Sequence, residues 1–233
     1  MNEKINNYAG LSSKVISKSF TELLEAFKKD GCPICRLNHL NIDSYFSSIL
    51  YECVNDPEVR KKLRNSLGYC REHSIQFIQF VESSYNRFGA SIITADVALE
   101  VIKELDRLLK LSLKDLNKVT VSNHICPACI YMQSHEHIYY SEITSNLEND
   151  DFLSEFLKSD GICQVHLLEL IKIIKNPHIR NIIIENQKLK LSYLIKDMNE
   201  FVKKHSGQSS QKVIPSEGDA FKKAIRKISG SFK

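Results

Sequence analysis

The sequence of 233 residues contains no tryptophan and few residues that interrupt helices, with only 8 glycines and 5 prolines. So few turn-forming residues argue against a turn-rich β fold and favour long helices. The apolar runs are also short, and none approaches the roughly 20 residues that a membrane-spanning helix needs. We therefore expect an all-α protein without a transmembrane segment.

The chain has no large excess of charge of either sign. Its formal net charge is +4 and its pI is about 8.6, which is too weakly basic to indicate nucleic-acid binding by itself. The first residues, Met1 to Asn7, include no apolar stretch of the kind found in a signal peptide. We therefore expect a cytoplasmic protein, in which paired cysteines are more often metal ligands than disulfides.

Six of the seven cysteines belong to a pattern that occurs twice. Each copy consists of C-P-x-C followed by C-x-x-H, with 35 positions between the two parts in the first copy and 34 in the second. The first copy supplies Cys32, Cys35, Cys70 and His73. The second copy supplies Cys126, Cys129, Cys163 and His166. Two copies with nearly equal spacing indicate an internal duplication.

The duplicated pattern has the residue types and spacing of a zinc site. A tight turn in C-P-x-C can direct both sulfurs at one ion, and the two ligands of C-x-x-H share a face at a helix start. Three thiolates and one imidazole complete a tetrahedral shell without an open position, which is typical of structural zinc. We predict that each copy forms its own Cys3His site. The alternative is a set of buried, reduced cysteines without metal.

Helical periodicity predicts a bundle of two pseudo-repeated halves, each with one metal ion. Residues 1–89 form the first metal-binding half, 90–118 a connecting helix, and 119–205 the second metal-binding half. Residues 206–233 form a polar linker and a basic amphipathic C-terminal helix, which Asp219 is expected to cap. Its apolar face consists of Phe221, Ala224, Ile225 and Ile228. This helix could dock on the body, on a partner or on an anionic surface, and docking on the body is favoured.

Capping signals predict where several helices begin. Asp56 precedes Pro57, Asn176 precedes Pro177, and Asn149-Asp150 mirrors Asn55-Asp56 in the second copy. An Asp or Asn cap followed by proline at the first helical position is a typical helix start. We therefore expect short helices from Pro57 and from Phe152, each leading back to a C-x-x-H segment.

The remaining candidates for chemistry are few. His39 and His124 lie near the C-P-x-C segments and could be alternative ligands or hydrogen-bond partners of ligands, although surface or packing roles are more common. Cys53 is expected to be a small apolar residue on a helix. We find no phosphate-binding glycine loop, nucleophile elbow or H-E-x-x-H motif. Since a catalytic zinc keeps a position open, we expect no enzymatic activity carried by these metal ions.

The chain resembles DUF6062, a family of uncharacterised prokaryotic proteins. The resemblance covers nearly the whole chain and rests on the segments 31–37, 51–60, 68–73, 126–129, 161–166 and 218–225. One departure is Phe221, where tryptophan would be expected in relatives, and this change should not affect the metal sites. The resemblance implies an all-helical metal-binding protein of bacteria or archaea and carries no reaction with it.

Three functions remain open on the sequence alone. We favour two structural zinc ions in a helical adaptor that binds another protein, because closed Cys3His shells are common for zinc. The first alternative is an iron–sulfur protein with a redox or sensing role. The second is nucleic-acid binding through the basic C-terminal helix. The sequence specifies neither the partner nor the oligomeric state.

Overall fold

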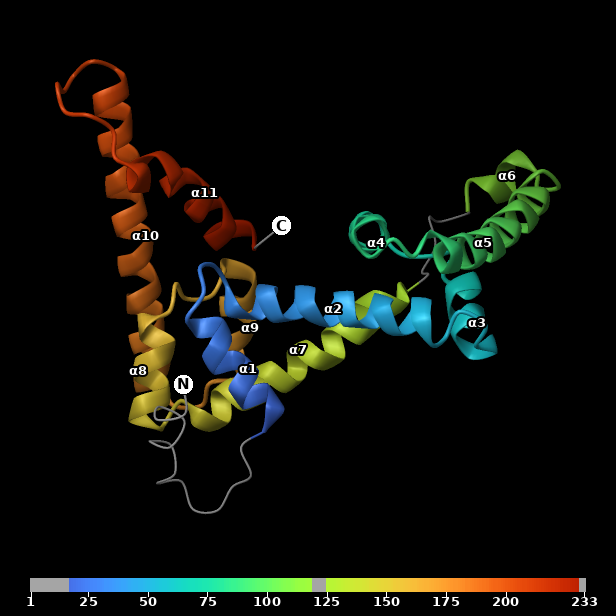
Figure 1. Ribbon diagram of the computed structural model, residues 1–233, viewed down its shortest axis with the longest axis horizontal. Helices are drawn as coiled ribbons and strands as arrows, with labels where there is room; N and C mark the ends of the chain where they lie inside the picture. The colour runs from blue at the N-terminus through green and yellow to red at the C-terminus, as the bar shows by residue number, and fades with distance from the viewer. Residues whose placement is uncertain (1–16, 119–124, 231–233) are drawn as a thin grey trace. The chain divides into compact units, whose positions relative to one another are not determined.

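The computed structural model describes residues 17–118 and 125–230, which fold into helices with no strand among them (Figure 1). This confirms the predicted all-α fold. The helices are α1 Lys18–Phe27, α2 Pro33–Tyr51, α3 Pro57–Asn65, α4 Arg71–Ser84, α5 Arg87–Leu108, α6 Leu113–Leu116, α7 Pro127–Asn146, α8 Asp150–Lys158, α9 Gln164–Ile173, α10 Pro177–His205 and α11 Pro215–Ser229. Among the described residues, no helix combines the length and apolar character needed to cross a bilayer.

The helices form two compact units that differ from the sequential halves suggested by the sequence. The terminal unit contains the described residues up to Leu37 and those from Ile138 onward. The middle unit is Asn38–His137. Both boundaries fall inside helices, since α2 passes from the terminal unit into the middle unit and α7 passes back. Residues 1–89 and 119–205 therefore each contribute to both units.

The terminal unit has a core of aromatic and aliphatic side chains. Phe152 of α8 is buried, and the centroid of its ring lies 5.6 Å from that of Phe20 and 5.5 Å from that of Phe27. The ring of Phe27 also meets Phe156 edge-on. Asn149 caps α8 by accepting a hydrogen bond from the backbone N–H of Phe152, so this helix begins at Asp150, two residues before the expected start at Phe152.

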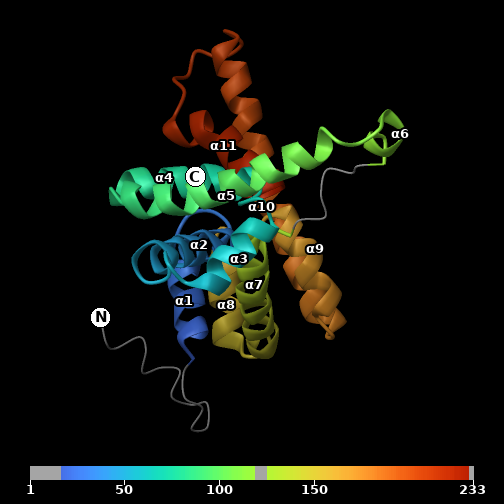
Figure 2. The ribbon, with the colours of Figure 1, turned by 90° about the vertical axis from the view of Figure 1, so that its right-hand side faces the viewer.

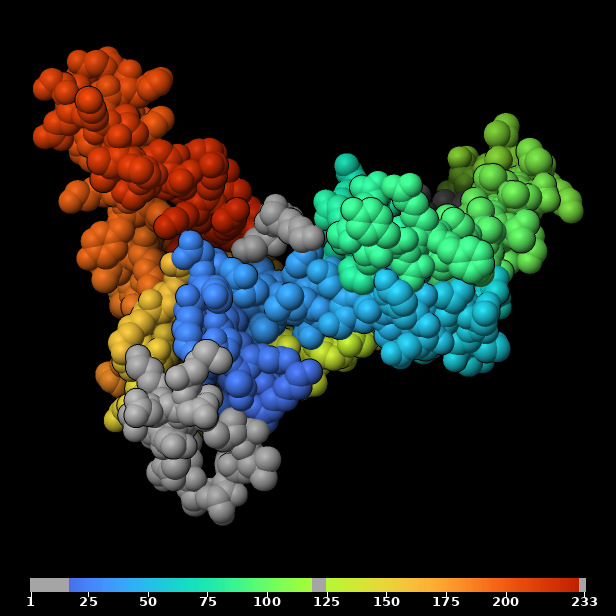
Figure 3. Space-filling view, viewed as in Figure 1, coloured from blue at the N-terminus to red at the C-terminus, as the bar shows by residue number. Residues whose placement is uncertain are grey.

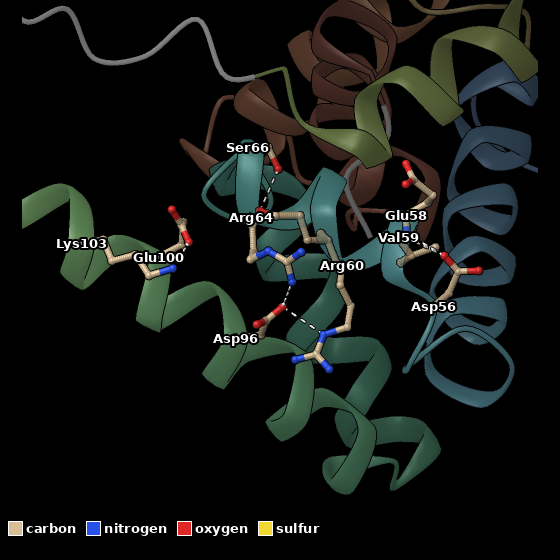
Figure 4. Close-up of polar contacts among 10 residues, drawn as sticks. Asp56, Glu58, Val59, Arg60, Arg64, Ser66, Asp96, Glu100 and Lys103 are labelled. Atoms are coloured by element: carbon tan, nitrogen blue, oxygen red, sulfur yellow. Dashed lines mark hydrogen bonds and ion pairs between the residues drawn. The ribbon is translucent and has the colours of Figure 1, made fainter.

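The middle unit has a separate aromatic core around Phe46 of α2. Its ring centroid lies 5.2 Å from that of Tyr69 and 5.1 Å from that of Phe77. Outside this core, the Asp96 carboxylate of α5 accepts hydrogen bonds from Arg60 Nε at 3.0 Å and from Arg64 Nη1 at 2.7 Å (Figure 4). These ion pairs connect α3 with α5.

Figure 4 also shows the predicted cap of α3. The Asp56 carboxylate accepts hydrogen bonds from the backbone N–H groups of Glu58 and Val59, and Pro57 occupies the first helical position. The connecting helix, in contrast, is shorter than the predicted range 90–118. It ends at Leu108, and the Ser112 hydroxyl begins the short helix α6 by accepting from the N–H of Asp115. A serine that caps a new helix competes with continuation of the old one.

The C-terminal helix α11 packs against α10 and α9 within the terminal unit, and Figures 2 and 3 show it beside α10. Its buried residues are Glu217, Ala220 and Ala224, whereas the predicted apolar residues Phe221, Ile225 and Ile228 are at least half exposed. Small alanines allow two helices to approach closely, so the packed face is not the most apolar one. The helix begins at Pro215 after Ile214, not at the expected cap Asp219.

Candidate metal centres

The eight predicted ligands gather into two groups of four. Site A lies in the terminal unit and consists of Cys32, Cys35, Cys163 and His166. Site B lies in the middle unit and consists of Cys70, His73, Cys126 and Cys129. In each group one sulfur or nitrogen atom per residue lies within 4.8 Å of all the others.

In site A, the imidazole Nδ1 of His166 is surrounded by three sulfurs. Nδ1 lies 3.4 Å from the Sγ atoms of Cys32 and Cys35 and 3.1 Å from Cys163 Sγ. The Sγ atoms of Cys35 and Cys163 are 3.8 Å apart. His166, Cys32 and Cys163 are buried, while Cys35 is partly accessible.

Site B repeats this geometry with a different set of residues. His73 Nδ1 lies 3.2 Å from Cys70 Sγ, 3.3 Å from Cys129 Sγ and 3.7 Å from Cys126 Sγ. The Sγ atoms of Cys70 and Cys129 are 3.7 Å apart. Both sites therefore direct the Nδ1 atom of histidine, not Nε2, at the three sulfurs.

These separations match a tetrahedral shell around a single ion. With metal–sulfur bonds of about 2.3 Å and metal–nitrogen bonds of about 2.0–2.1 Å, neighbouring sulfurs lie about 3.8 Å apart and a sulfur lies about 3.6 Å from nitrogen. The sulfur–sulfur distances of 3.7 and 3.8 Å agree with this, and the sulfur–nitrogen distances of 3.1 to 3.7 Å scatter around it. Both donor sets therefore fit one metal ion each.

The prediction that each sequence copy forms its own site is wrong. Site A combines the C-P-x-C of the first copy with the C-x-x-H of the second. Site B combines the C-x-x-H of the first copy with the C-P-x-C of the second. The reason lies in α2 and α7, which have 19 and 20 residues and therefore extend roughly 28–30 Å. Each carries the chain away from its own C-P-x-C into the other unit. The duplication is thus real, but its metal sites are exchanged between the copies.

The local structure of the two motifs explains how the ligands converge. Pro33 and Pro127 are the first residues of α2 and α7, so the second cysteine of each C-P-x-C lies in the first helical turn. Cys70 and Cys163 occupy the cap positions of α4 and α9, with histidine three residues later. Both helices can begin at the proline itself, because proline is tolerated at the first helical position.

Site A has supporting contacts that the sequence analysis did not identify. The Asp160 carboxylate accepts a hydrogen bond of 2.7 Å from the backbone N–H of Gly31, which joins the chain before Cys32 to the chain before Cys163. Gly31 and Gly161 have positive φ angles of 87° and 83°, a conformation that glycine adopts without strain. The sequence does not reveal this contact, because Gly31 and Asp160 lie 129 positions apart.

The end of α11 also lies against site A. A Cβ atom at Gly230 would stand 3.3 Å from Cys35 Sγ and 3.8 Å from Cys163 Sγ, so the backbone there approaches the sulfurs closely. Lys227 donates to the backbone carbonyl of Asp160. Burial lowers the pKa of Lys227, whereas Asp160 and the sulfurs of Cys32 and Cys163 raise it. A partly buried ammonium near two of the sulfurs is suited to partly neutralise a thiolate shell.

Site B lies beside aromatic side chains. Burial raises the pKa of Tyr45 to about 12 and raises that of Tyr69 further, and in both cases the charge of Cys126 adds to the effect. Burial also raises the pKa of the Cys129 thiol and lowers that of His73. An apolar setting disfavours bare thiolates, so a metal cation among them would compensate for the charge.

The protonation of site A is uneven. Burial raises the pKa of the Cys32 thiol, while hydrogen bonds from Cys32 and Cys35 lower the pKa of Cys163. Cys163 is therefore the sulfur on which negative charge is most favoured. Binding of a metal ion to such a group requires loss of the remaining thiol protons.

Two of the other candidate residues, His39 and Cys53, lie outside both sites. His39 is on α2 in the middle unit, where its Nε2 lies 3.5 Å from the Asp43 carboxylate. Cys53 is partly buried in the turn after α2, not on a helix as expected. His124 lies outside the described residues.

The fold and the two sites define an all-helical protein with two Cys3His groups that can hold metal ions. The model of the family described as "Family of unknown function (DUF6062)" matches residues 19–233, and the chain belongs to this family. An uncharacterized 23.9 kDa protein in the xynA 3'region of Caldicellulosiruptor sp. (strain Rt8B.4) is 29% identical over 155 residues. The match covers 64% of this chain and 70% of that relative. No solved structure matches.

Proposed function

We propose that this protein is a zinc-binding helical adaptor, in which two structural Cys3His sites stabilise the fold that binds another protein. The observation that carries the proposal is the convergence of four ligand atoms within 4.8 Å at each site. This spacing suits one ion. The ligands of a multi-iron cluster bind different irons and must lie further apart.

Zinc would contribute free energy of folding at these positions. The three thiolates and the imidazole fill a tetrahedral shell, so neither site offers an open position for water or a substrate. Site A would connect segments separated by 134 positions in the sequence, and site B segments separated by 59. Cross-links between distant segments restrict the unfolded chain, which is the expected role of a structural metal.

The proposed location is the cytoplasm of a prokaryote. The six thiols of the two sites must remain reduced to bind zinc, and a reducing compartment maintains them in that state. The relative from Caldicellulosiruptor supports a prokaryotic source.

A protein partner is supported by an apolar stripe on the last turns of α5 and its C-cap residue. Ile102, Leu105 and Leu109 follow at steps of three and four residues, and their exposed fractions are 54%, 54% and 84%. Stripes of this spacing are typical of helices that dock on another protein. A catalytic role would require an open metal position or a separate reactive group.

Metal analysis tests the central part of this proposal. Protein purified without oxygen should be colourless and contain two zinc ions per chain by mass spectrometry of the elements. A brown sample with iron and sulfide would favour an iron–sulfur protein instead. One metal ion or none per fully folded chain would contradict the two-site proposal.

Histidine replacement tests the structural role. His73→Cys and His166→Cys each keep four ligands, so both variants should fold and retain two zinc ions. A variant that kept its zinc but lost a measurable turnover would show that the site is catalytic.

Crosslinking tests the adaptor role. A photoreactive residue at position 105 should capture one defined protein in cells of the native host, whereas the same residue at position 103 should not. Lys103 is exposed on the same helix and pairs with Glu100, which makes it a matched control. Equal capture at both positions, or no protein at position 105, would contradict an adaptor that uses this stripe.

A further inference from the structure

A cavity of about 270 Å³ in the terminal unit adjoins site A. Its walls come from the loop before α2, the loop between α8 and α9, and the helices α10 and α11. Cys32 and Cys163 line it together with the apolar side chains of Ile162 and Leu194 and the ring of Tyr193. The cavity therefore combines an apolar wall with access to one side of the metal site.

Positive charge dominates the lining of this cavity. Its carboxylates are Asp30 and Asp160. Its cations are Lys158, Lys190, Lys223, Arg226 and Lys227. A zinc ion with three thiolates and a neutral imidazole carries one negative charge, so positive charge would remain in excess with the metal bound.

Three of these cations already have partners in the fold. Lys158 pairs with Glu155 at 3.1 Å. Lys190 Nζ donates to the backbone carbonyls of Leu157 and Ser159 at 2.8 and 2.6 Å. Lys227 donates to the carbonyl of Asp160, as described above. Lys190 and Lys227 bind backbone carbonyls at the end of α8 and in the loop that follows it, whereas Lys158 pairs within α8.

The other two cations, Lys223 and Arg226, have hydrogen-bond donors that the fold does not use. Within the described residues, the side chains of Lys223 and Arg226 form neither a hydrogen bond nor a close ion pair. They lie three residues apart on α11, so both project from the same face of the helix into the cavity lining. The planar guanidinium of arginine presents donors in a fork that matches two phosphate oxygens.

We propose that this cavity binds a small phosphomonoester, with the phosphate held by Lys223 and Arg226 and the organic group against Tyr193 and Leu194. A small molecule fits better than a polymer, because the site is a cavity and not a basic stripe. Lys190 supports the assignment. Burial, and then the charge of Lys227, lower the pKa of Lys190 to about 8, while Asp160 opposes the shift. A bound anion would stabilise the charged form of this ammonium.

Calorimetry with the full-length, metal-loaded protein tests this proposal. AMP and inorganic phosphate are the probes, and one AMP should bind per chain, more tightly than phosphate. Lys223→Gln and Arg226→Gln should each weaken AMP binding at least tenfold. Both residues are exposed and make no contacts that hold the fold, so the variants should keep wild-type circular dichroism and metal content.

The matched control is Lys188→Gln, which removes the same charge from α10. Lys188 is exposed, pairs with Glu185 and does not line the cavity, so AMP affinity should stay unchanged. Absence of AMP binding would overturn the proposal, as would equal loss in all three variants. Tighter binding of a single-stranded oligonucleotide that AMP does not displace would also overturn it, in favour of a nucleic-acid surface.

Discussion

Sites A and B have the same donors and nearly the same geometry, but the protein supports them differently. Site A has the Asp160–Gly31 hydrogen bond, the Lys227 ammonium and the backbone of Gly230 beside its sulfurs. Site B adjoins the partly buried aromatic residues Tyr45 and Tyr69. Duplication thus preserved the ligand shell, while the surroundings became polar at one site and aromatic at the other.

The difference can be followed position by position. By motif alignment, Asp160 of the second copy corresponds to Leu67 of the first, and Gly31 corresponds to Ile125. The donor in site A is a backbone N–H, which Ile125 also has, but the side chain of Leu67 has no oxygen to accept it. Tyr69 likewise corresponds to Ile162. A ligand shell therefore tolerates very different neighbours when its own geometry is fixed by the helix starts.

The largest expected effect comes from removing two ligands at once, and it tests the exchanged pairing directly. Cys32→Ser with Cys163→Ser should abolish site A and leave one zinc ion per chain. Cys32→Ser with Cys70→Ser should damage both sites and leave none. Each structural zinc is worth roughly 10–16 kcal/mol in zinc-finger peptides, so the second variant should be far less stable.

Elemental analysis and chemical unfolding under anaerobic conditions measure this difference. The control is Cys53→Ser, which should retain both ions because Cys53 lies outside the sites. If each sequence copy formed its own site, the two double variants would exchange their metal contents.

The next effect compares the two cores. Phe46→Ala in the middle unit and Phe152→Ala in the terminal unit should each lower the free energy of unfolding by about 3–5 kcal/mol, because each removes a buried ring. Hydrogen exchange should increase mainly in the unit that contains the substitution. Phe88→Ala is the control, since this ring is 81% exposed. Equal loss of protection throughout the chain would show that the two units unfold as one.

A smaller effect should separate the two sites through Asp160. Asp160→Asn replaces the charged acceptor of the Gly31 N–H with a neutral one and should lower the free energy of unfolding by about 1 kcal/mol. Asp30→Asn is the matched control, because it removes the same charge from the same cavity and Asp30 does not accept this hydrogen bond. Zinc should also leave site A faster in Asp160→Asn when a chelator is added. Identical release rates in both variants would argue against a supporting role for Asp160.

The smallest effect concerns the ion pairs of the middle unit. The hydrogen bond from Arg60, and then that from Arg64, lower the pKa of Asp96 below its ordinary value of 3.8. The pairs therefore stabilise the fold above that value, and their contribution is lost as the pH falls through the lowered pKa. Asp96→Asn should cost roughly 1 kcal/mol or less at neutral pH, because the groups are partly exposed.

Urea unfolding at several pH values measures this contribution as the difference between wild type and Asp96→Asn. The difference should shrink below about pH 4. Loss of zinc in acid affects both proteins and cancels in the comparison. A difference that is constant with pH would show that the Asp96 carboxylate is not stabilised by its charge.

Much of the fold followed from the sequence because its signals are local. Capping by Asp56 and Asn149 marked the starts of α3 and α8, and helical periodicity identified the other long helices. All eight candidate ligands come together in the structure for the same reason, since C-P-x-C and C-x-x-H each fix two donors within one turn. Whether they bind metal stays a prediction until the metal is measured.

The pairing of the motifs could not be predicted in this way. Any C-P-x-C combined with any C-x-x-H gives three sulfurs and one imidazole, so the local chemistry is identical for both arrangements. The choice depends on where α2 and α7 carry the chain and on long-range packing. The packed face of α11 was predicted only at Ala224 for a related reason, because Ala220 and Ala224 are selected by the close approach of a neighbouring helix, not by hydrophobicity.

The exchanged pairing also sets the order in which the sites can form during synthesis. Site B is complete once Cys129 has left the ribosome, whereas Cys32 must wait for His166, which is 134 positions later. At about 5–20 residues per second, this delay lasts roughly 7–27 s. During that time Cys32 and Cys35 share the nascent chain with Cys70 and His73, which form a chemically equivalent ligand set. Early capture of zinc by these four residues would produce a misfolded intermediate, so newly made chains should gain from a low concentration of available zinc.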